Sequence, residues 1–377
     1  MLYNDDITFI MRIFVTGTRG VPNIPGGVEK HCQELYPLIV KSGHEVILAT
    51  RTPYVYQKEP SWQGVKLCHI FAPRQKNIEA IIHTFLAVLK ARLLNVDLIH
   101  IHTVGLGLMV PLAKMLGLRV VVTNHGPDYD REKWGRVAKA MLRMGEYLGG
   151  KYANEVIVIS SVIADIIEKR CGRKSNLIYN GVPLPAARED TTFLSRLSVK
   201  PRNYILAVAR FVPEKGLHDL IAAFSELDGD YQLVIAGDAD HETPYSASLK
   251  DMAAKDDRII LTGYITGTPL QQIFANARLF VLPSSHEGLP IALLEAMSYE
   301  LPVLVSDIPA NKEVNLGKHR YFPCGQRAAL KRQIKVLLEM GLPDEERTRY
   351  HQMLTGMYNW QNIATQTVAV YEKALSG

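Results

Sequence analysis

Two carboxylates occur close together in the segment from Pro283 to Met297, which reads PSSHEGLPIALLEAM. Glu287 lies in its polar part, whereas Glu295 lies between Leu294 and Ala296 in an apolar stretch. An unpaired carboxylate buried among apolar side chains is strongly unfavourable, so Glu295 needs hydrogen-bond partners. Ribose hydroxyls would serve. The alternative is an arginine or backbone partner for Glu295 and solvent for Glu287.

The same segment is expected to begin a helix at Pro290. Proline suits the first helical position because it lacks an N–H group that a helix start would leave unpaired. Gly288 and Leu289, just before it, are then expected to offer free backbone N–H groups to a ligand.

Two cations, Arg210 and Lys215, follow the apolar run from Tyr204 to Val208, and Gly216 comes next. Two cations five positions apart in one loop can hold a pyrophosphate and neutralise the charge that grows on it as a bond breaks. A solvated pair of loop cations is the alternative.

A third candidate loop follows the apolar run from Arg12 to Val15 and contains Gly26 and Gly27 before Glu29. Glycines here would let a phosphate or sugar approach backbone N–H groups at the positive end of a helix. The loop matches neither the dinucleotide-binding fingerprint nor the Walker motif, which disfavours NAD binding and ATP hydrolysis. The alternative is that the glycines only turn the chain.

Two series of short apolar runs, alternating with amphipathic segments, would position these loops. Runs that are apolar on both faces are typical of parallel strands covered by helices. Ligands collect beyond the carboxyl ends of such strands, where the loops above lie. The expected strands are Arg12 to Val15, Glu45 to Ala49, Asp97 to Ile101, Arg119 to Thr123 and Glu155 to Ile159, then Tyr204 to Val208, Gln232 to Ala236, Ile259 to Leu261, Leu279 to Leu282 and Val303 to Val305.

The chain of 377 residues is long enough for two domains of ~150 residues each. The run from Asn180 to Pro185, followed by a charged stretch to Lys200, is typical of a linker. We therefore predict one domain over residues 1–183 and a second over 184–359. The residues before Met11 have no place in the pattern, so either Met1 or Met11 is the natural start.

Composition excludes several classes of protein. With 47% hydrophobic and 21% charged residues, the chain is neither disordered nor collagen-like. The four cysteines form no Cys-x-x-Cys pair, which favours a reducing cytoplasm over a disulfide framework or a zinc ribbon. No apolar run reaches the ~20 residues that span a bilayer, and the start lacks the pattern of a secretory signal.

Positive charge is concentrated in the first half of the chain. Residues 1–190 hold 24 Lys and Arg against 17 Asp and Glu, whereas residues 191–377 hold 19 against 21. Within the basic half, Arg131 to Leu148 predicts an amphipathic helix with Trp134, Val137, Met141, Met144 and Leu148 on one face and Arg136, Lys139 and Arg143 mostly on another. This helix would lie on an anionic membrane surface, or its apolar stripe would cover the sheet. A nucleic-acid partner is not expected, since no recognised binding module is present.

Together these features resemble the retaining nucleotide-sugar glycosyltransferases of family four, also known as glycosyl transferases group one. The resemblance rests on Glu287 and Glu295 with seven residues between, Arg210 and Lys215 before a glycine, and Gly26-Gly27-x-Glu29, and it extends to Asn180-Gly181-Val182 and the Trp360 segment. It implies the GT-B fold, in which two doubly wound Rossmann-like α/β domains face a cleft. The acceptor would bind the first domain and the nucleotide sugar the second, while residues 360–377 would cross back to the first.

The resemblance also implies roles for single residues. Glu295 would bind the ribose, Glu287 the hydroxyls of the donor sugar, and Arg210 and Lys215 the diphosphate. Gly27, with the N–H groups of Gly288 and Leu289, would complete the phosphate cradle, and the backbone at Gly237 would approach the nucleotide. His125, in the sequence Thr123-Asn124-His125-Gly126, would face the donor sugar, whereas a lone histidine is more often structural.

The reaction implied is sugar transfer with retention, without a cofactor and without a catalytic metal. Two Asp-x-Asp triplets, Asp228 to Asp230 and Asp238 to Asp240, are the candidates for a metal site. The first precedes an expected strand, at the wrong end of the sheet, and magnesium needs ligands beyond two carboxylates. The acceptor would be a glycan or a lipid-linked sugar. The alternatives are a soluble transferase acting on a small acceptor and a non-catalytic protein that binds nucleotide sugars.

Overall fold

The computed structural model describes residues 9–55, 58–75, 78–127, 129, 135–185, 190–239 and 241–377. Two compact units make up the chain: Met1–Asn180 with Trp360–Gly377, and Gly181–Asn359. This division lies three residues before the boundary expected at 183. Residues 1–8, part of the segment before Met11, lie outside the described residues, as do Arg131, Trp134 and Asp240.

The first unit is built on an 8-stranded sheet in the order β3-β4-β2-β1-β5-β6-β7-β8. All neighbouring strands are parallel except β3 and β4, which pair antiparallel. The strands are β1 (Arg12–Thr16), β2 (Glu45–Arg51), β3 (Ser61–Trp62), β4 (Val65–Ile70), β5 (Leu98–His102), β6 (Arg119–Asn124), β7 (Glu155–Val158) and β8 (Asn176–Leu177).

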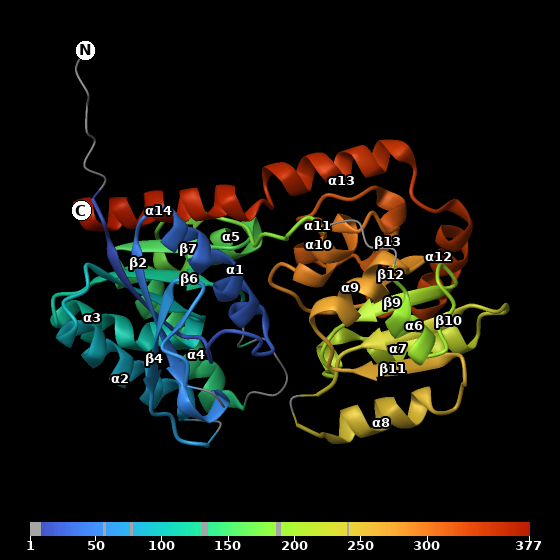
Figure 1. Cartoon of the computed structure of the whole chain (residues 1–377), viewed down its shortest axis with the longest axis horizontal. Helices are drawn as coiled ribbons and strands as arrows, with labels where there is room; N and C mark the ends of the chain where they lie inside the picture. The colour runs from blue at the N-terminus through green and yellow to red at the C-terminus, as the bar shows by residue number, and fades with distance from the viewer. Residues whose placement is uncertain are drawn as a thin grey trace, which may run out of the picture. The chain divides into compact units, whose positions relative to one another are not determined.

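Helices cover both faces of this sheet (Figure 1). They are α1 (Gly27–Lys41), α2 (Glu79–Leu93), α3 (Val110–Met115), α4 (Arg136–Tyr152), α5 (Ser161–Cys171) and α14 (Trp360–Ser376), with the 3₁₀ turns η1 (Thr52–Tyr54) and η2 (Val104–Met109). The end signals are clear for α5, where the Ser160 side chain accepts a hydrogen bond from the N–H of Ile163 and Gly172 adopts the left-handed conformation after Cys171.

The second unit is built on a 6-stranded parallel sheet in the order β11-β10-β9-β12-β13-β14. Its strands are β9 (Tyr204–Val208), β10 (Gln232–Ala236), β11 (Ile259–Gly263), β12 (Leu279–Leu282), β13 (Val303–Ser306) and β14 (Tyr321–Phe322). Its helices are α6 (Thr192–Arg196), α7 (Leu217–Ser225), α8 (Pro244–Ala253), α9 (Gly267–Ala275), α10 (Ile291–Ser298), α11 (Pro309–Lys312), α12 (Arg327–Met340) and α13 (Asp344–Gly356), with the 3₁₀ turns η4 (Pro213–Lys215) and η5 (Lys318–Arg320).

Counted from β9, the strand order of the second unit is 3-2-1-4-5-6, that of a doubly wound Rossmann-like sheet. The direction of winding reverses between β9 and β12, and in the first unit between β1 and β5. Loops at the carboxyl ends of the strands beside such a reversal are the usual place for a ligand. The predicted fold class, two doubly wound α/β domains, is confirmed.

The C-terminal helix α14 belongs to the first unit. Its Trp360, Ile363 and Tyr371 are buried in one apolar core with Leu35 and Ile39 of α1. Figure 1 shows α14, in red, beside the blue α1. The expected return of residues 360–377 to the first domain is therefore confirmed.

The basic amphipathic helix forms as α4, but its apolar stripe does not cover the sheet. Gly145 and Gly149 of α4 lie against the turn η2, so closely that a Cβ at Gly107 would come 2.2 Å from the carbonyl oxygen of Gly145. The larger residues point away: Val137 is 76% exposed and Met144 is 52% exposed. The alternative in which the apolar stripe covers the sheet is wrong for these residues, because α4 packs through its glycines.

Candidate active site

Two loops of the second unit are locked together at the carboxyl ends of β9 and β12. Gly216, which precedes α7, has a positive φ of 63°, and a Cβ there would lie 2.2 Å from the carbonyl oxygen of Pro283. The N–H of Ser285 donates to the carbonyl oxygen of Glu214 at 2.8 Å. Only glycine permits this approach, so it determines where Lys215 stands relative to the loop after β12.

Lys215 and Glu287 meet across these two loops. The ammonium Nζ of Lys215 lies 2.5 Å from the carboxylate Oε1 of Glu287. Both side chains are largely buried, with 19% and 9% exposed. The structure therefore brings together two of the residues that the sequence placed in one site, as a charge-assisted hydrogen bond.

A third loop, after β10, contacts the loop after β9. A Cβ at Gly237, whose φ is 139°, would lie 2.0 Å from the carbonyl oxygen of Ala209. The N–H of Phe211 donates to the carbonyl oxygen of Asp238 at 3.1 Å. Arg210, half-buried between Ala209 and Phe211, is thereby held at the carboxyl ends of β9 and β10, the region predicted for it.

Helix α10 begins one residue later than expected. Pro290, with φ −77° and ψ 105°, caps the helix, whose first residue is Ile291. Leu289 is buried, while Gly288 and Glu295 are partly exposed. Glu295 is thus less buried than its apolar neighbours Leu294 and Ala296 suggested, because it lies on the more open side of the helix.

The glycine loop of the first unit surrounds the start of α1. At Gly26, with φ 142°, a Cβ would meet the Glu29 carboxylate, whereas a Cβ at Gly27 would meet nothing within 4 Å. Oε1 of Glu29 accepts from the backbone N–H of Arg19 at 3.0 Å and from its Nε at 3.1 Å. Glu29 thus organises the loop after β1 and leaves open space at the N-terminal end of α1, where an anion is favoured.

His125 follows β6 in a short loop that a buried carboxylate supports. Glu146 of α4, 3% exposed, accepts hydrogen bonds from Asn124 Nδ2 at 3.2 Å and from the Tyr129 hydroxyl at 3.1 Å. It also pairs with Arg170 at 2.7 Å. Oδ1 of Asn124 in turn accepts from the N–H of Gly126 at 2.9 Å. The Asn124 side chain therefore connects the backbone just after His125 to the carboxylate of Glu146.

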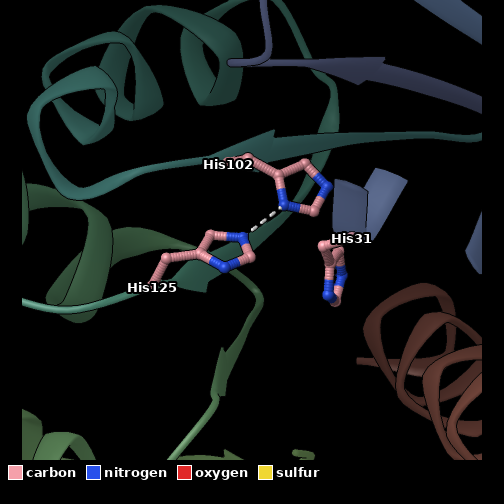
Figure 2. A group of neighbouring side chains, drawn as sticks. All are labelled: His31, His102 and His125. Atoms are coloured by element: carbon pink, nitrogen blue, oxygen red, sulfur yellow. Dashed lines mark hydrogen bonds between the residues drawn. The ribbon is translucent and has the colours of Figure 1, made fainter. Parts of the chain in front are cut away.

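His125 is one of a group of histidines in the first unit, shown in Figure 2. Its Nε2 lies 2.9 Å from Nδ1 of His102, which ends β5. Nε2 of His102 lies 2.6 Å from the Tyr36 hydroxyl, which lies 3.0 Å from Nδ1 of His100. His31 of α1 stands edge-on to both His102 and His125, with ring centroids 5.4 and 4.9 Å away.

Burial keeps these rings neutral. It lowers the pKa of His31 to about 4, although a hydrogen bond to Asn180 opposes the shift. Burial, with the neighbouring imidazoles, lowers the pKa of both His102 and His125 well below the usual value. At neutral pH the group offers nitrogen lone pairs and N–H donors without net charge.

Comparison with known proteins identifies the family of the chain. Residues 25–185 match Glycosyltransferase Family 4, and residues 190–353 match Glycosyl transferases group 1. The chain belongs to the family-four glycosyltransferases of the GT-B fold.

Relatives of this glycosyltransferase include a glycogen synthase and an O-antigen chain mannosyltransferase. It is 26% identical to a glycogen synthase of Mycobacterium tuberculosis, over 97% of this chain and 96% of that one. It is 28% identical to the O-antigen chain mannosyltransferase RfbU of Salmonella typhimurium, over 47% of this chain and 49% of the relative. Its fold matches the crystal structure of Anabaena HepE in complex with UDP-glucose, with a TM-score of 0.78 at 18% identity, covering 96% and 99% of the two chains.

Sequence reasoning about this glycosyltransferase missed His31 and His102 as neighbours of His125. The available signal was the position of His102 at the end of an apolar strand next to the one that precedes His125. The two Asp-x-Asp triplets gain no support as a metal site from the residues described: Asp238 pairs with Lys250 at 3.1 Å, Asp228 with Lys335 at 3.6 Å, and Asp240 lies outside the described part.

Proposed function

We propose that this glycosyltransferase moves a sugar, with retention, from a nucleoside-diphosphate donor to a hydroxyl group of a glycan or lipid-linked acceptor. The observation that carries the proposal is the ion pair between Lys215 and Glu287, which joins the loops after β9 and β12 at the switch point of the second sheet, with Arg210 in the first of these loops. Cations that are held in advance at such a place suit a leaving group that gains negative charge.

In this proposal Arg210 and Lys215 bind the diphosphate. Lys215 is held by Glu287 at 2.5 Å, so its ammonium is already oriented and part of its conformational entropy is already lost. Glu287 would use its second carboxylate oxygen for a hydroxyl group of the donor sugar. Glu295 would bind the ribose, and the N–H groups of Gly288 and Leu289 would approach the phosphates.

The first unit would supply the remaining contacts. The open space at Gly27 suits a phosphate at the start of α1, and His125 would face the donor sugar as a neutral imidazole. The backbone at Gly237 would approach the nucleotide in the second unit.

Transfer needs a stabilised leaving group more than a protein base. As the bond from the sugar to the diphosphate breaks, Arg210 and Lys215 would stabilise the phosphate oxygen that becomes negative. The acceptor hydroxyl would attack from the same face and give its proton to that oxygen, which explains retention without a dedicated base. We propose that this step uses no metal ion and no cofactor.

We further propose that the enzyme works in the cytoplasm, at the inner face of the membrane, in the assembly of a surface polysaccharide or glycolipid. The exposed face of α4 supports this, because Val137 and Met144 lie at the surface of a helix that also carries Arg136, Lys139 and Arg143. The four cysteines are free, as in proteins of a reducing compartment. In the parts of the chain that are described, no helix is both long and apolar enough to cross a membrane.

A screen of donor hydrolysis with UDP-, GDP- and ADP-sugars tests the proposal. We expect release of the nucleoside diphosphate from one of these donors, at an undiminished rate in excess chelator. Dependence on an added divalent ion would contradict the metal-free mechanism. Tight nucleotide binding without turnover, in the presence of a panel of glycan and lipid-linked acceptors, would favour a binding protein instead. Turnover only with a small soluble acceptor would favour the soluble transferase.

A further inference from the structure

We propose that His31, His102 and His125 bind one divalent transition-metal ion of the Zn²⁺ type. One nitrogen atom from each ring lies within 4.8 Å of the corresponding atoms of the other two. Tetrahedral zinc, with bonds of ~2.0–2.1 Å, holds its ligand nitrogens roughly 3.3 Å apart. The 2.9 Å separation of His102 Nδ1 and His125 Nε2 is close to this spacing, and Figure 2 shows the rings of His31, His102 and His125 next to one another.

In two of these rings, the nitrogen that would not bind the ion makes a hydrogen bond, as it does in metal-binding histidines. Nδ1 of His31 donates to the amide Oδ1 of Asn180 at 2.9 Å, which leaves its Nε2 to face an ion. Nε2 of His102 lies 2.6 Å from the Tyr36 hydroxyl, which leaves its Nδ1. A hydrogen bond at the remote nitrogen fixes the tautomer and the ring orientation of a ligand histidine.

The ligand set selects the type of ion. Three imidazoles without a carboxylate suit zinc, cobalt, nickel or copper, whereas magnesium and calcium prefer oxygen ligands. His31 and His102 are buried, with 4% and 0% exposed, and His125 is partly exposed. The ion would therefore enter from the side of His125, and its fourth position would be open to water or to a hydroxyl group.

Such an ion would bond to Nε2 of His125, so this nitrogen could no longer contact another ligand. If His125 contacts the donor sugar, as proposed above, zinc would then inhibit sugar transfer and a chelator would restore it. This consequence rests on the proposed function, but binding of the ion does not.

Titration of the full chain, free of any affinity tag, with CoCl₂ tests the binding itself. We expect one Co²⁺ per chain, with the strong visible absorption of a four-coordinate site, and its loss when ZnCl₂ displaces the cobalt. His125→Ala and His31→Asn should each remove the band, while His351→Ala, at an exposed position in the second unit, should keep it. No saturable band, or a band that survives the first two substitutions, would overturn the proposal.

Asn180 offers a test that keeps all three ligands. Asn180→Ala removes the acceptor for His31 and should weaken Co²⁺ binding ~10–100-fold, whereas Asn180→Asp, which keeps an acceptor, should restore it. Circular dichroism melts verify that each variant is folded. Equal affinity in all three proteins would overturn the assigned orientation of His31 and with it the site.

Activity measurements separate the two proposals. If Co²⁺ binds but zinc leaves donor hydrolysis unchanged, the metal site stands and the role of His125 at the donor sugar is wrong. If zinc inhibits His125→Ala and the native protein equally, the inhibition does not arise at this site, and the link between the ion and transfer is wrong.

Discussion

The candidate residues of the second unit carry charge, whereas those of the first unit are buried neutral rings. Lys215 and Glu287 form an ion pair at 2.5 Å on loops whose positions are set by Gly216 and Gly237. His102 and His125 instead share a hydrogen bond at 2.9 Å with burial lowering both pKa values. The difference is one of chemistry: the ion pair offers full charges, whereas the neutral rings offer nitrogen lone pairs and N–H donors.

The largest effect on activity is expected from removing the cations of the second unit. Lys215→Ala and Arg210→Ala should each lower the turnover number ~10²–10³-fold, because both cations would stabilise charge that develops only in the transition state. Lys331→Ala, which removes a surface ion pair with Glu226, is the matched control and should leave turnover unchanged. Steady-state kinetics with saturating donor is the measurement. Weak donor binding with normal turnover at saturation would contradict the transition-state role.

The stability of the first unit should fall in acid because of its buried histidines. The pKa of His31 falls to about 4 in the folded chain, and that of His83 and of His100 to about 3, from 6.5 in the unfolded chain. Below pH 6.5 the unfolded state therefore binds more protons than the folded state. The free energy of unfolding should fall by on the order of 1.4 kcal/mol per pH unit for each such histidine, from pH 6.5 down toward pH 4.

Tryptophan fluorescence during urea unfolding isolates this effect, because all three tryptophans, at positions 62, 134 and 360, belong to the first unit. His83→Leu should reduce the number of protons taken up on unfolding by about one, and with it the slope of the free energy of unfolding against pH. His83 is chosen because its ring is buried but lies outside the group around His125. If the urea concentration at the midpoint of unfolding does not change between pH 7 and pH 5, the histidine rings are not held neutral by burial.

The two units also differed in how well the sequence predicted them. The bounds of β9, β10 and β12 match the predicted strands, because each is a short run that is apolar on both faces. Strand β4 (Val65–Ile70) was missed because its middle residues are partly exposed and it is not apolar on both faces. The strands β3, β8 and β14, of two residues each, carry no such pattern and were missed as well.

The sites show the same contrast. Arg210 and Lys215 lie in the loop after β9 and Glu287 in the loop after β12, and the strand order makes these two strands neighbours. His31, His102 and His125 come from three elements, and only the packing of α1 on the sheet brings His31 to the others. The hydrophobic pattern also could not predict which face of α4 is buried. Backbone contact between Gly145 and η2, rather than hydrophobicity, decides this.

A moderate effect is expected at Glu295, at the edge of the charged site. Glu295→Ala should weaken binding of the free nucleoside diphosphate by ~1–3 kcal/mol, because charge-assisted hydrogen bonds to the ribose would be lost. Isothermal titration calorimetry measures this directly, with Glu339→Ala, at an exposed position of α12, as the control. Unchanged affinity would remove Glu295 from the nucleotide site.

The smallest effect per residue is expected on the basic surface of the first unit. If α4 docks on a membrane, Arg136, Lys139 and Arg143 should each contribute up to ~1 kcal/mol of attraction to anionic lipid, screened within a Debye length of ~8 Å. The measurement is co-sedimentation with vesicles that contain phosphatidylglycerol, at low and high salt. Changing all three residues to Glu should abolish binding at low salt, while the same change at the exposed residues Lys41, Arg92 and Lys174 of the same unit should reduce it far less.

Equal loss of binding in both triple variants would show that net charge alone attracts the protein to the vesicles. No binding by the native protein would leave the exposed Val137 and Met144 without a membrane role. A donor-hydrolysis assay on each variant confirms that the fold is intact, so that a loss of binding reports on the surface of α4 itself.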